Sequence, residues 1–354
     1  MSNKFWLGNI LLKYKKSFIK GFTLCIVPLI VFQIFRVGTL MIFAFNNSSS
    51  TSAETTKDVT LPKSERINLL LLGEDDAAKL TDVIMLVSLD KYNNSVFILQ
   101  IPRDTYAEYT SASYRKLNAA RNVLDGGRQL ADFFEYNLGI QIDHFVIFDL
   151  EAVSKIVDAL GGIEIDVPVN MSYSDPYQDL VIEINSGKQV LNGEKAKQFV
   201  RFREGYVRGD LDRLDVQKLF LSALLKKVSS ADIQCITKAA LNSFSYIESD
   251  MSYKDCIDIV MDYRGVEAQS VMLSTLPGSD IRGSSGAWYY IMNREAAYVL
   301  ISEKFYSDLA YDEFDKNRKF TSTIRAGFND IYEAKNQYRA VVYSAEDINN
   351  AKIN

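Results

Sequence analysis

Three apolar segments of strand length follow one another near the start of this chain, and they constrain its fold more than any other feature. Residues 67–73 read INLLLLG, residues 83–89 read VIMLVSL and residues 95–101 read SVFILQI. The polar residues 90–94, DKYNN, separate the last two segments, which predicts an antiparallel hairpin. Pro102 comes directly after the hairpin. Because proline has no N–H to donate to a sheet, it marks the end of the strand.

Charged residues adjoin the ends of these predicted strands in the sequence. In a hairpin the start of the first strand lies beside the end of the second, so we expect Asp82 to neighbour Arg103. The short segment 73–81, GEDDAAKLT, returns the chain to the same edge and brings Asp75 and Asp76 there. The sequence therefore predicts two or three carboxylates and an arginine at one edge of the sheet.

Helical and strand patterns alternate through the next hundred residues. Residues 128–139 and 151–162 have amphipathic helix patterns, the second stopped by two glycines, and residues 192–200 begin as a helix. Strand patterns occupy 144–150, 163–169 and 180–187. This alternation predicts an α/β class: an α-β-α layered domain in which helices cover a central mixed β-sheet.

A second group of charged residues lies within residues 200–220. Arg201 and Arg203 are two apart and share a side if the chain is extended there. Asp210 can cap a helix that places Arg213 and Gln217 on one face, since they are four residues apart. The alternative is a solvated helix whose arginines pair with acidic neighbours. Those neighbours are Glu204, Asp212 and Asp215.

The N-terminus carries an apolar run of 24 residues, 22–45, which is long enough to cross a bilayer as one helix despite Arg36. Lysines precede it and no acid occurs before Glu54, so the positive-inside rule predicts a cytoplasmic N-terminus at 1–21. Those lysines are Lys4, Lys13, Lys15, Lys16 and Lys20. The Ser/Thr-rich segment 46–65 is typical of a linker. A cleaved signal peptide is the alternative.

The predicted extracytoplasmic part is acidic. Six of the 40 Lys and Arg residues and none of the 45 Asp and Glu residues lie before residue 54, so 34 basic residues face 45 acidic ones beyond it, a net charge near −11. Nucleic acid is therefore excluded as an expected partner. Of the three cysteines, Cys25 lies in the apolar run, and an outside location permits but does not establish a Cys235–Cys256 disulfide. The single histidine, His144, opens an apolar strand, where a structural role is expected.

Several short motifs, taken in order and spacing, resemble the LytR-CpsA-Psr family of Gram-positive cell-wall proteins. They are LLLLGEDD, TDVIMLVSLD, IPRDTY, KLNAA, IDHFVIFDLEAVSKIVDALGGIEIDVP, GKQVLNGEKAKQFVRFR and GDLDRLDVQK. The likeness is strong over residues 66 to 228 and weaker to about 305. It implies a catalytic domain at 66–305 and leaves 306–354 as a C-terminal extension.

The resemblance implies a membrane-anchored, Mg²⁺-dependent phosphotransferase outside the cell, single-pass with its N-terminus in the cytoplasm. Such an enzyme attaches a glycopolymer, for example teichoic acid or capsule, from a polyprenyl pyrophosphate carrier to peptidoglycan through a phosphodiester. By the same resemblance Asp75 and Asp82 bind the metal, with Asp76 as a second candidate for the first position. The residues matched to pyrophosphate binding are Arg103, Lys116, Arg201, Arg203, Arg213 and Gln217. The resemblance gives Asp75, Asp82 and Arg103 as the catalytic residues.

This chemistry fits the residue types. A hard cation held by one or two carboxylates neutralises charge on a pyrophosphate, and arginines add bidentate contacts with permanent charge. The lipid tail needs an apolar surface, so we expect an apolar groove between sheet and helices that reaches the arginines. Two other functions stay open: a hydrolase that releases polyprenyl phosphate to water, and a non-catalytic binder of lipid-linked wall precursors.

Overall fold

The computed structural model describes the domain and leaves the predicted N-terminal segments outside the described residues. It describes residues 66–75, 80–107, 115–124, 126–177, 180–204, 210–251, 263, 266–282, 286–305, 310–311, 314, 342–344 and 347–348. The predicted tail 1–21, membrane run 22–45 and linker 46–65, and most of 306–354, fall outside that set. Among the helices within it, none combines the length and the apolar character needed to cross a bilayer.

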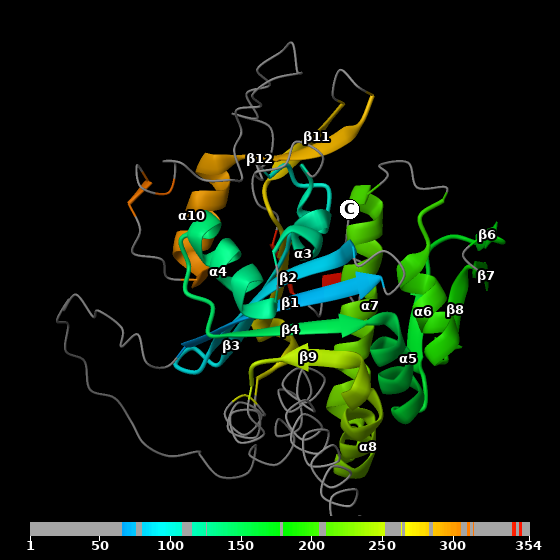
Figure 1. The fold of residues 1–354 in the computed structure, drawn as a ribbon. Helices are drawn as coiled ribbons and strands as arrows, with labels where there is room; N and C mark the ends of the chain where they lie inside the picture. Colours follow the sequence, from blue (N-terminus) through cyan, green and yellow to red (C-terminus); the bar gives the residue numbers. More distant parts are fainter. Residues whose placement is uncertain are drawn as a thin grey trace, which may run out of the picture.

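Seven described strands form one mixed sheet in the order β13-β10-β3-β2-β1-β4-β9 (Figure 1). Neighbours β1–β2 and β2–β3 are antiparallel, while β1–β4 and β3–β10 are parallel. The predicted hairpin and the mixed sheet are thus confirmed. The strands span β1 Arg66–Asp75, β2 Leu80–Asp90, β3 Ser95–Gln100, β4 His144–Asp149, β9 Ile247–Ser249, β10 Val271–Thr275 and β13 Val342–Ser344.

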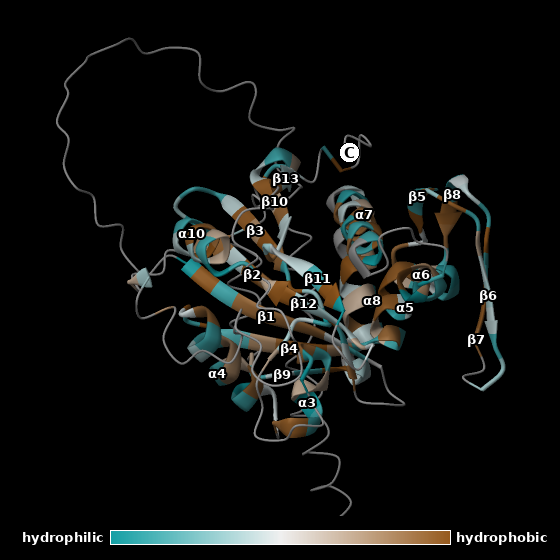
Figure 2. Ribbon diagram, turned by 90° about the horizontal axis from the view of Figure 1, so that it is seen from above, coloured by the Kyte–Doolittle hydropathy of each residue, from teal (hydrophilic) through white to brown (hydrophobic). Residues whose placement is uncertain are grey.

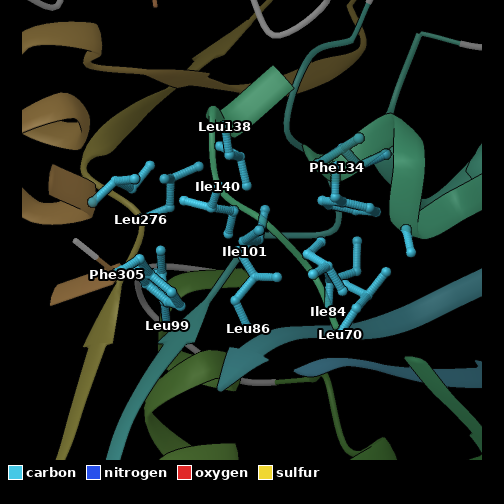
Figure 3. Packing of buried hydrophobic residues seen from close by; sticks show 14 of the residues in the cluster. Leu70, Ile84, Leu86, Leu99, Ile101, Phe134, Leu138, Ile140, Leu276 and Phe305 are labelled. Atoms are coloured by element: carbon cyan, nitrogen blue, oxygen red, sulfur yellow. The ribbon is translucent and has the colours of Figure 1, made fainter. Parts of the chain in front are cut away.

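Helices cover both faces of this sheet, as the layered prediction requires. On one face lie α3 (Ala120–Val123), α4 (Gly127–Leu138) and α10 (Arg294–Phe305), with the short 3₁₀ turn η2 (Leu117–Ala119). They pack a core in which Phe134 and Leu138 from α4 meet Ile84 and Leu86 from β2 (Figure 3). Side chains alternate between the two faces of the sheet along β2 and β3. In β2 the even-numbered residues lie in this core and the odd-numbered residues lie on the opposite face.

The opposite face is covered by α5 (Leu150–Ala159) and α7 (Asp210–Ser230), with α8 (Ile233–Ser243) packed on these helices and α6 (Gly193–Arg201) outside them (Figure 2). Helix α5 starts where its cap Asp149 accepts a hydrogen bond from the Ala152 N–H at 2.8 Å. Asn192 caps α6 in the same way through the Lys195 N–H at 2.9 Å. Leu219, Leu221 and Leu225 of α7 pack on the sheet.

Three two-stranded antiparallel sheets stand outside the central sheet. Two of them pair β5 (Ile163–Val167) with β8 (Gly187–Leu191) and β6 (Met171–Asp175) with β7 (Leu180–Ile184). The third pairs β11 (Gly278–Arg282) with β12 (Trp288–Met292). The single strand predicted over 180–187 is therefore wrong at its end, because Gly187 turns the chain with φ +101° into a separate strand.

Candidate functional site

Asp82 lies at a β-bulge, and this bulge aims its side chain. Gly73 pairs with Val83 and Glu74 with Thr81, so Asp82 is the extra residue between two registered pairs. A Cβ on Gly73 would come within 2.9 Å of the Val83 Cβ, so the close approach of β1 and β2 here requires glycine. Bulges re-aim one side chain at the end of a sheet. The carboxylate of Asp82 consequently leaves the ladder and faces arginines from three other segments.

Arg103 reaches Asp82 from the end of the hairpin, as predicted. Its Nη1 donates to Asp82 Oδ1 at 2.6 Å. The Thr105 N–H and hydroxyl both donate to the Pro102 carbonyl, at 3.0 and 2.6 Å, and the Asn118 N–H donates to the Arg103 carbonyl at 2.9 Å. Pro102 ends the strand and these bonds hold the following turn, so the guanidinium is positioned by a rigid backbone.

Two further arginines approach the same carboxylate. Arg203 follows α6, and its Nη2 donates to Asp82 Oδ2. Arg213 lies in the first turns of α7 with Nη1 3.9 Å from Asp82 Oδ1, and its side chain is only 2% exposed. Burial of Arg213 rules out the solvated-face alternative for that residue. We call Arg103, Arg203 and Arg213 the arginine cluster. The Asp82 side chain at its centre is 21% exposed, so solvent reaches this carboxylate.

The electrostatics of the cluster keep Asp82 ionised. Partial burial pushes the pKa of Asp82 upward, but attraction from Arg203, Arg103 and Arg213 and the Arg103 hydrogen bond together lower it below its ordinary 3.8. Three guanidinium groups face this one carboxylate, so the cluster with Asp82 carries an excess of positive charge. In a domain that is acidic as a whole, such a concentration of permanent cations is suited to an anionic ligand.

Gln217 and Lys116 adjoin the cluster, whereas Arg201 is placed differently from the prediction. Gln217 is one turn beyond Arg213 on α7, and its buried Oε1 accepts no hydrogen bond. Lys116 is bound to Asp104 instead of Asp82, with Nζ 2.9 Å from the Asp104 Oδ1. Arg201 is the last residue of α6, so the extended backbone that would have set it beside Arg203 begins only at the following residue. Sequence reasoning missed Asp104 as the partner of Lys116.

The predicted metal ligands are only partly described. Asp75 ends β1, and its Cα pairs with that of Leu80, which places its backbone at the Asp82 edge. Asp76 lies outside the described residues. Over the part of the chain that is described, no three His, Cys, Asp or Glu side chains gather as a metal site. Asp82 does supply carboxylate oxygens, the donor type that Mg²⁺ prefers.

An apolar cavity lies between the sheet and α5 and α7, as the lipid requirement predicts. The space between its lining atoms, counted together with adjoining open solvent, is about 1060 Å³. Gln217 is its polar residue, at the end nearest the arginine cluster. The remaining lining is apolar. It consists of Leu71, Val83, Met85, Val87, Ile98, Val146, Phe148, Leu150, Ala152, Val153, Ile156, Val200, Phe220, Leu221, Leu224, Val228 and Ile247.

Two other residues singled out from the sequence lie away from the site. His144 opens β4 and its Nδ1 is 3.4 Å from Asp250 Oδ1, which fits the structural role expected for it. Cys235 on α8 is a free thiol, and Cys256 lies outside the described residues.

A mixed α/β domain in which an arginine cluster lies next to an apolar cavity is suited to an amphiphilic anion. Residues 39–304 match the LytR_cpsA_psr family, and the chain belongs to it. The resemblance inferred from the motifs is thereby confirmed.

Known relatives and structures extend this comparison. TagV of Bacillus subtilis, a polyisoprenyl-teichoic acid–peptidoglycan teichoic acid transferase, is 30% identical over 240 residues, which is 64% of this chain and 61% of the relative. TagU of the same organism, with the same activity in its name, is 27% identical over 73% of this chain and 84% of the relative. The crystal structure of B. subtilis TagV superimposes with a TM-score of 0.59 at 27% identity, covering 70% of this chain and all of that one.

Proposed function

We propose that this protein transfers a glycopolymer from a polyprenyl pyrophosphate carrier to peptidoglycan and forms a phosphodiester. The observation that carries the proposal is the arrangement of the arginine cluster at one end of the apolar cavity. A pyrophosphate with a long prenyl tail needs both features in contact. The names of TagV and TagU, transferases of teichoic acid to peptidoglycan, support teichoic acid as the polymer class.

In the proposed reaction an acceptor hydroxyl of peptidoglycan attacks the phosphorus that carries the polymer. The bond from this phosphorus to the bridging oxygen breaks, and polyprenyl phosphate leaves with the bridging oxygen and its electron pair. The hydroxyl proton passes to solvent or to the leaving phosphate. Arg103, Arg203 and Arg213 bind the pyrophosphate oxygens, and their positive charge stabilises the charge that grows on the leaving phosphate.

We also propose that the site uses Mg²⁺, held by Asp82 together with Asp75, with Asp76 as the alternative to Asp75. When bound, the cation supplies Lewis-acid stabilisation of phosphate charge. In this structure both oxygens of Asp82 are engaged by Arg103 and Arg203. A cation at Asp82 therefore competes with these arginines unless they turn to the pyrophosphate. Binding of Mg²⁺ and binding of pyrophosphate are consequently expected to strengthen each other.

The proposed location is the outer side of the cell membrane, with residues 22–45 as a single-pass anchor and 1–21 in the cytoplasm. The supporting features are the lysines before the apolar run and the absence of acids there. An acceptor such as peptidoglycan lies on that side, so the topology and the reaction are consistent.

The function is tested with purified full-length protein in detergent, a lipid-linked glycopolymer, Mg²⁺ and peptidoglycan. Transfer predicts polymer covalently attached to peptidoglycan and one polyprenyl phosphate released for each attachment. Release of polyprenyl phosphate with the polymer left in solution would make the protein a hydrolase. Binding with no release in the presence of both acceptor and water would make it a carrier of precursors.

A further inference from the structure

A second group of ion pairs adjoins the bulge that carries Asp82. Arg121 on α3 is its centre, with Nε 3.0 Å from Glu74 Oε1 and Nη2 donating to Glu248 Oε2 at 2.8 Å. The side chains of Arg121 and Glu74 are only 19% and 16% exposed, so solvent screens their attraction less than it would at the surface. One guanidinium therefore ties α3 to the end of β1 and to β9.

Glu74 is one of the residues that frame the bulge at Asp82. Its Cα is registered with that of Thr81, and the pair before it is Gly73 with Val83. A bulge locally disrupts the ladder of backbone hydrogen bonds, so regular pairing restrains this edge less than the rest of the sheet. The ion pair with α3 adds a restraint at the position where the register of the two strands shifts.

This restraint and the arginine cluster approach the bulge from different faces of the sheet. Leu70 and Leu72 of β1 pack in the core under α3 and α4, and Glu74 continues this alternation to the same face. Arg213 approaches Asp82 from α7, which covers the other face. The backbone at the bulge is thus held from the α3 face, while its carboxylate is paired with an arginine from the α7 face.

The segment that carries Arg121 also holds the turn that carries Arg103. The Asn118 N–H donates to the Arg103 carbonyl at 2.9 Å, and Arg121 follows Asn118 by three residues, about one helical turn. The segment formed by η2 and α3 is therefore bound to the Arg103 turn at one point and, through Glu74, to the bulge of Asp82 at the next. It connects the two partners of the central ion pair.

We propose that Arg121 is a positioning residue, which sets the Asp82 carboxylate relative to the Arg103 guanidinium for the transfer reaction. The inference rests on the proposed function and deepens it. In this assignment Arg121 contacts neither pyrophosphate nor cation, and it acts through Glu74 and through its own backbone segment. Small displacements matter at a reacting centre, where an error of about 1 Å costs up to about 100-fold in rate.

The first test compares the transfer rates of Arg121→Ala and Arg128→Ala, in full-length protein in detergent, at a temperature at which circular dichroism shows each variant to be folded. Arg128 is the matched control because it also pairs with two carboxylates, of Asp132 and Glu135 at 2.7 and 3.0 Å, but lies on α4. We expect Arg121→Ala to lower the turnover number about tenfold and Arg128→Ala to leave it within about twofold of the parent.

Glu74→Gln provides a second variant in case Arg121→Ala does not fold, since it keeps the size of the side chain and removes the ion pair. It is expected to show a similar loss of rate. A parental rate for folded Arg121→Ala or Glu74→Gln would overturn the positioning role and leave the proposed function intact.

A double-mutant cycle separates the placement of Asp82 from a general loss of stability. In an Asp82→Asn background, Arg121→Ala should lower the remaining transfer rate less than about twofold, because the carboxylate that it places is no longer there. The same coupling should appear without substrate: Asp82→Asn should lower the melting temperature less in Arg121→Ala than in the parent. Additive losses in both measurements would overturn the proposal.

The two measurements also distinguish this inference from the function on which it rests. Absence of transfer by the parental protein would overturn the proposed function. The coupling in melting temperature would then still report whether Arg121 acts on the ion pairs of Asp82.

Discussion

The carboxylate of Asp82 accepts a hydrogen bond from Arg103 at 2.6 Å across the open end of the β2–β3 hairpin. The two residues are 21 positions apart in the sequence. Arg203 takes the second oxygen of the same carboxylate. The acid thus holds two of the cations that we assign to pyrophosphate. This contact organises the site before substrate arrives, which lowers the cost of bringing three guanidinium groups together.

Arg203→Lys should lower the turnover number about tenfold, a loss of about 1.4 kcal/mol of transition-state stabilisation. Lysine keeps the charge but cannot reproduce the planar, two-pronged contact of a guanidinium with phosphate. The measurement is the rate of transfer at saturating lipid-linked substrate. Arg128→Lys is the matched control, because Arg128 lies on α4 and pairs with Asp132 and Glu135 away from the site. A parental rate for the Arg203 variant would remove that residue from the site.

A larger side chain in the apolar cavity should weaken the binding of a long prenyl tail more than that of a short one. Leu224 lines the cavity, and Leu224→Phe adds bulk there. We expect the dissociation constant of farnesyl pyrophosphate to rise about tenfold, while that of the shorter dimethylallyl pyrophosphate changes less than twofold. Leu241→Phe on α8, where the leucine is 65% exposed, controls for the substitution itself. The same increase for both ligands would show that Leu224 does not contact the tail.

The ion pairs of Asp82 should make stability depend on pH below neutrality. The folded-state pKa of Asp82 lies below its ordinary 3.8, so its contribution is present above about pH 3.8 and is lost as the pH falls through the folded value. The difference in melting temperature between parent and Asp82→Asn should therefore be largest near pH 7 and shrink toward pH 3. A difference that is constant from pH 7 to pH 3 would contradict the lowered pKa.

Much of this site could be predicted from local sequence because hairpin topology is short-range. A turn between two apolar segments and a proline after the second are enough to bring Asp82 to Arg103. The bulge that turns Asp82 out of the ladder was not predictable, since it depends on how β1 and β2 pack near Gly73. Arg213 was placed on the correct helix face by spacing, but its burial depends on tertiary packing.

The placement of β12 beside the segment after Arg103 shows what local patterns miss. Residues 288–292, WYYIM, read as an ordinary apolar strand, and nothing in their spacing indicates a position beside Arg103. That position follows from a bridge between Thr105 and Tyr290, which are 185 residues apart in the sequence. Likewise Arg201 and Arg203 were grouped by an extended pattern, whereas the helix α6 continues through Arg201.

The proposed topology predicts the behaviour of a reporter fused after Asn354. An enzyme that is active only outside the cytoplasm should be active in this fusion, and a reporter that requires the cytoplasm should be inactive. Lysines on the N-terminal side of residues 22–45 are the physical reason. Replacing the five lysines before the run by glutamate serves as a control that should weaken this preference. Cytoplasmic activity of the parental fusion would contradict both the topology and the access to peptidoglycan.

The most direct test of the account is the Mg²⁺-dependent transfer rate of Asp82→Asn, measured on the same preparation as its melting temperature. Asparagine keeps the size and hydrogen-bonding capacity of the side chain but removes the charge that a hard cation requires. We predict a folded protein with a lowered melting temperature and a transfer rate about 100-fold below the parent, a loss of about 2.7 kcal/mol. A folded variant that transfers glycopolymer at the parental rate with the same Mg²⁺ dependence would contradict the assignment of Asp82 as the centre of the site.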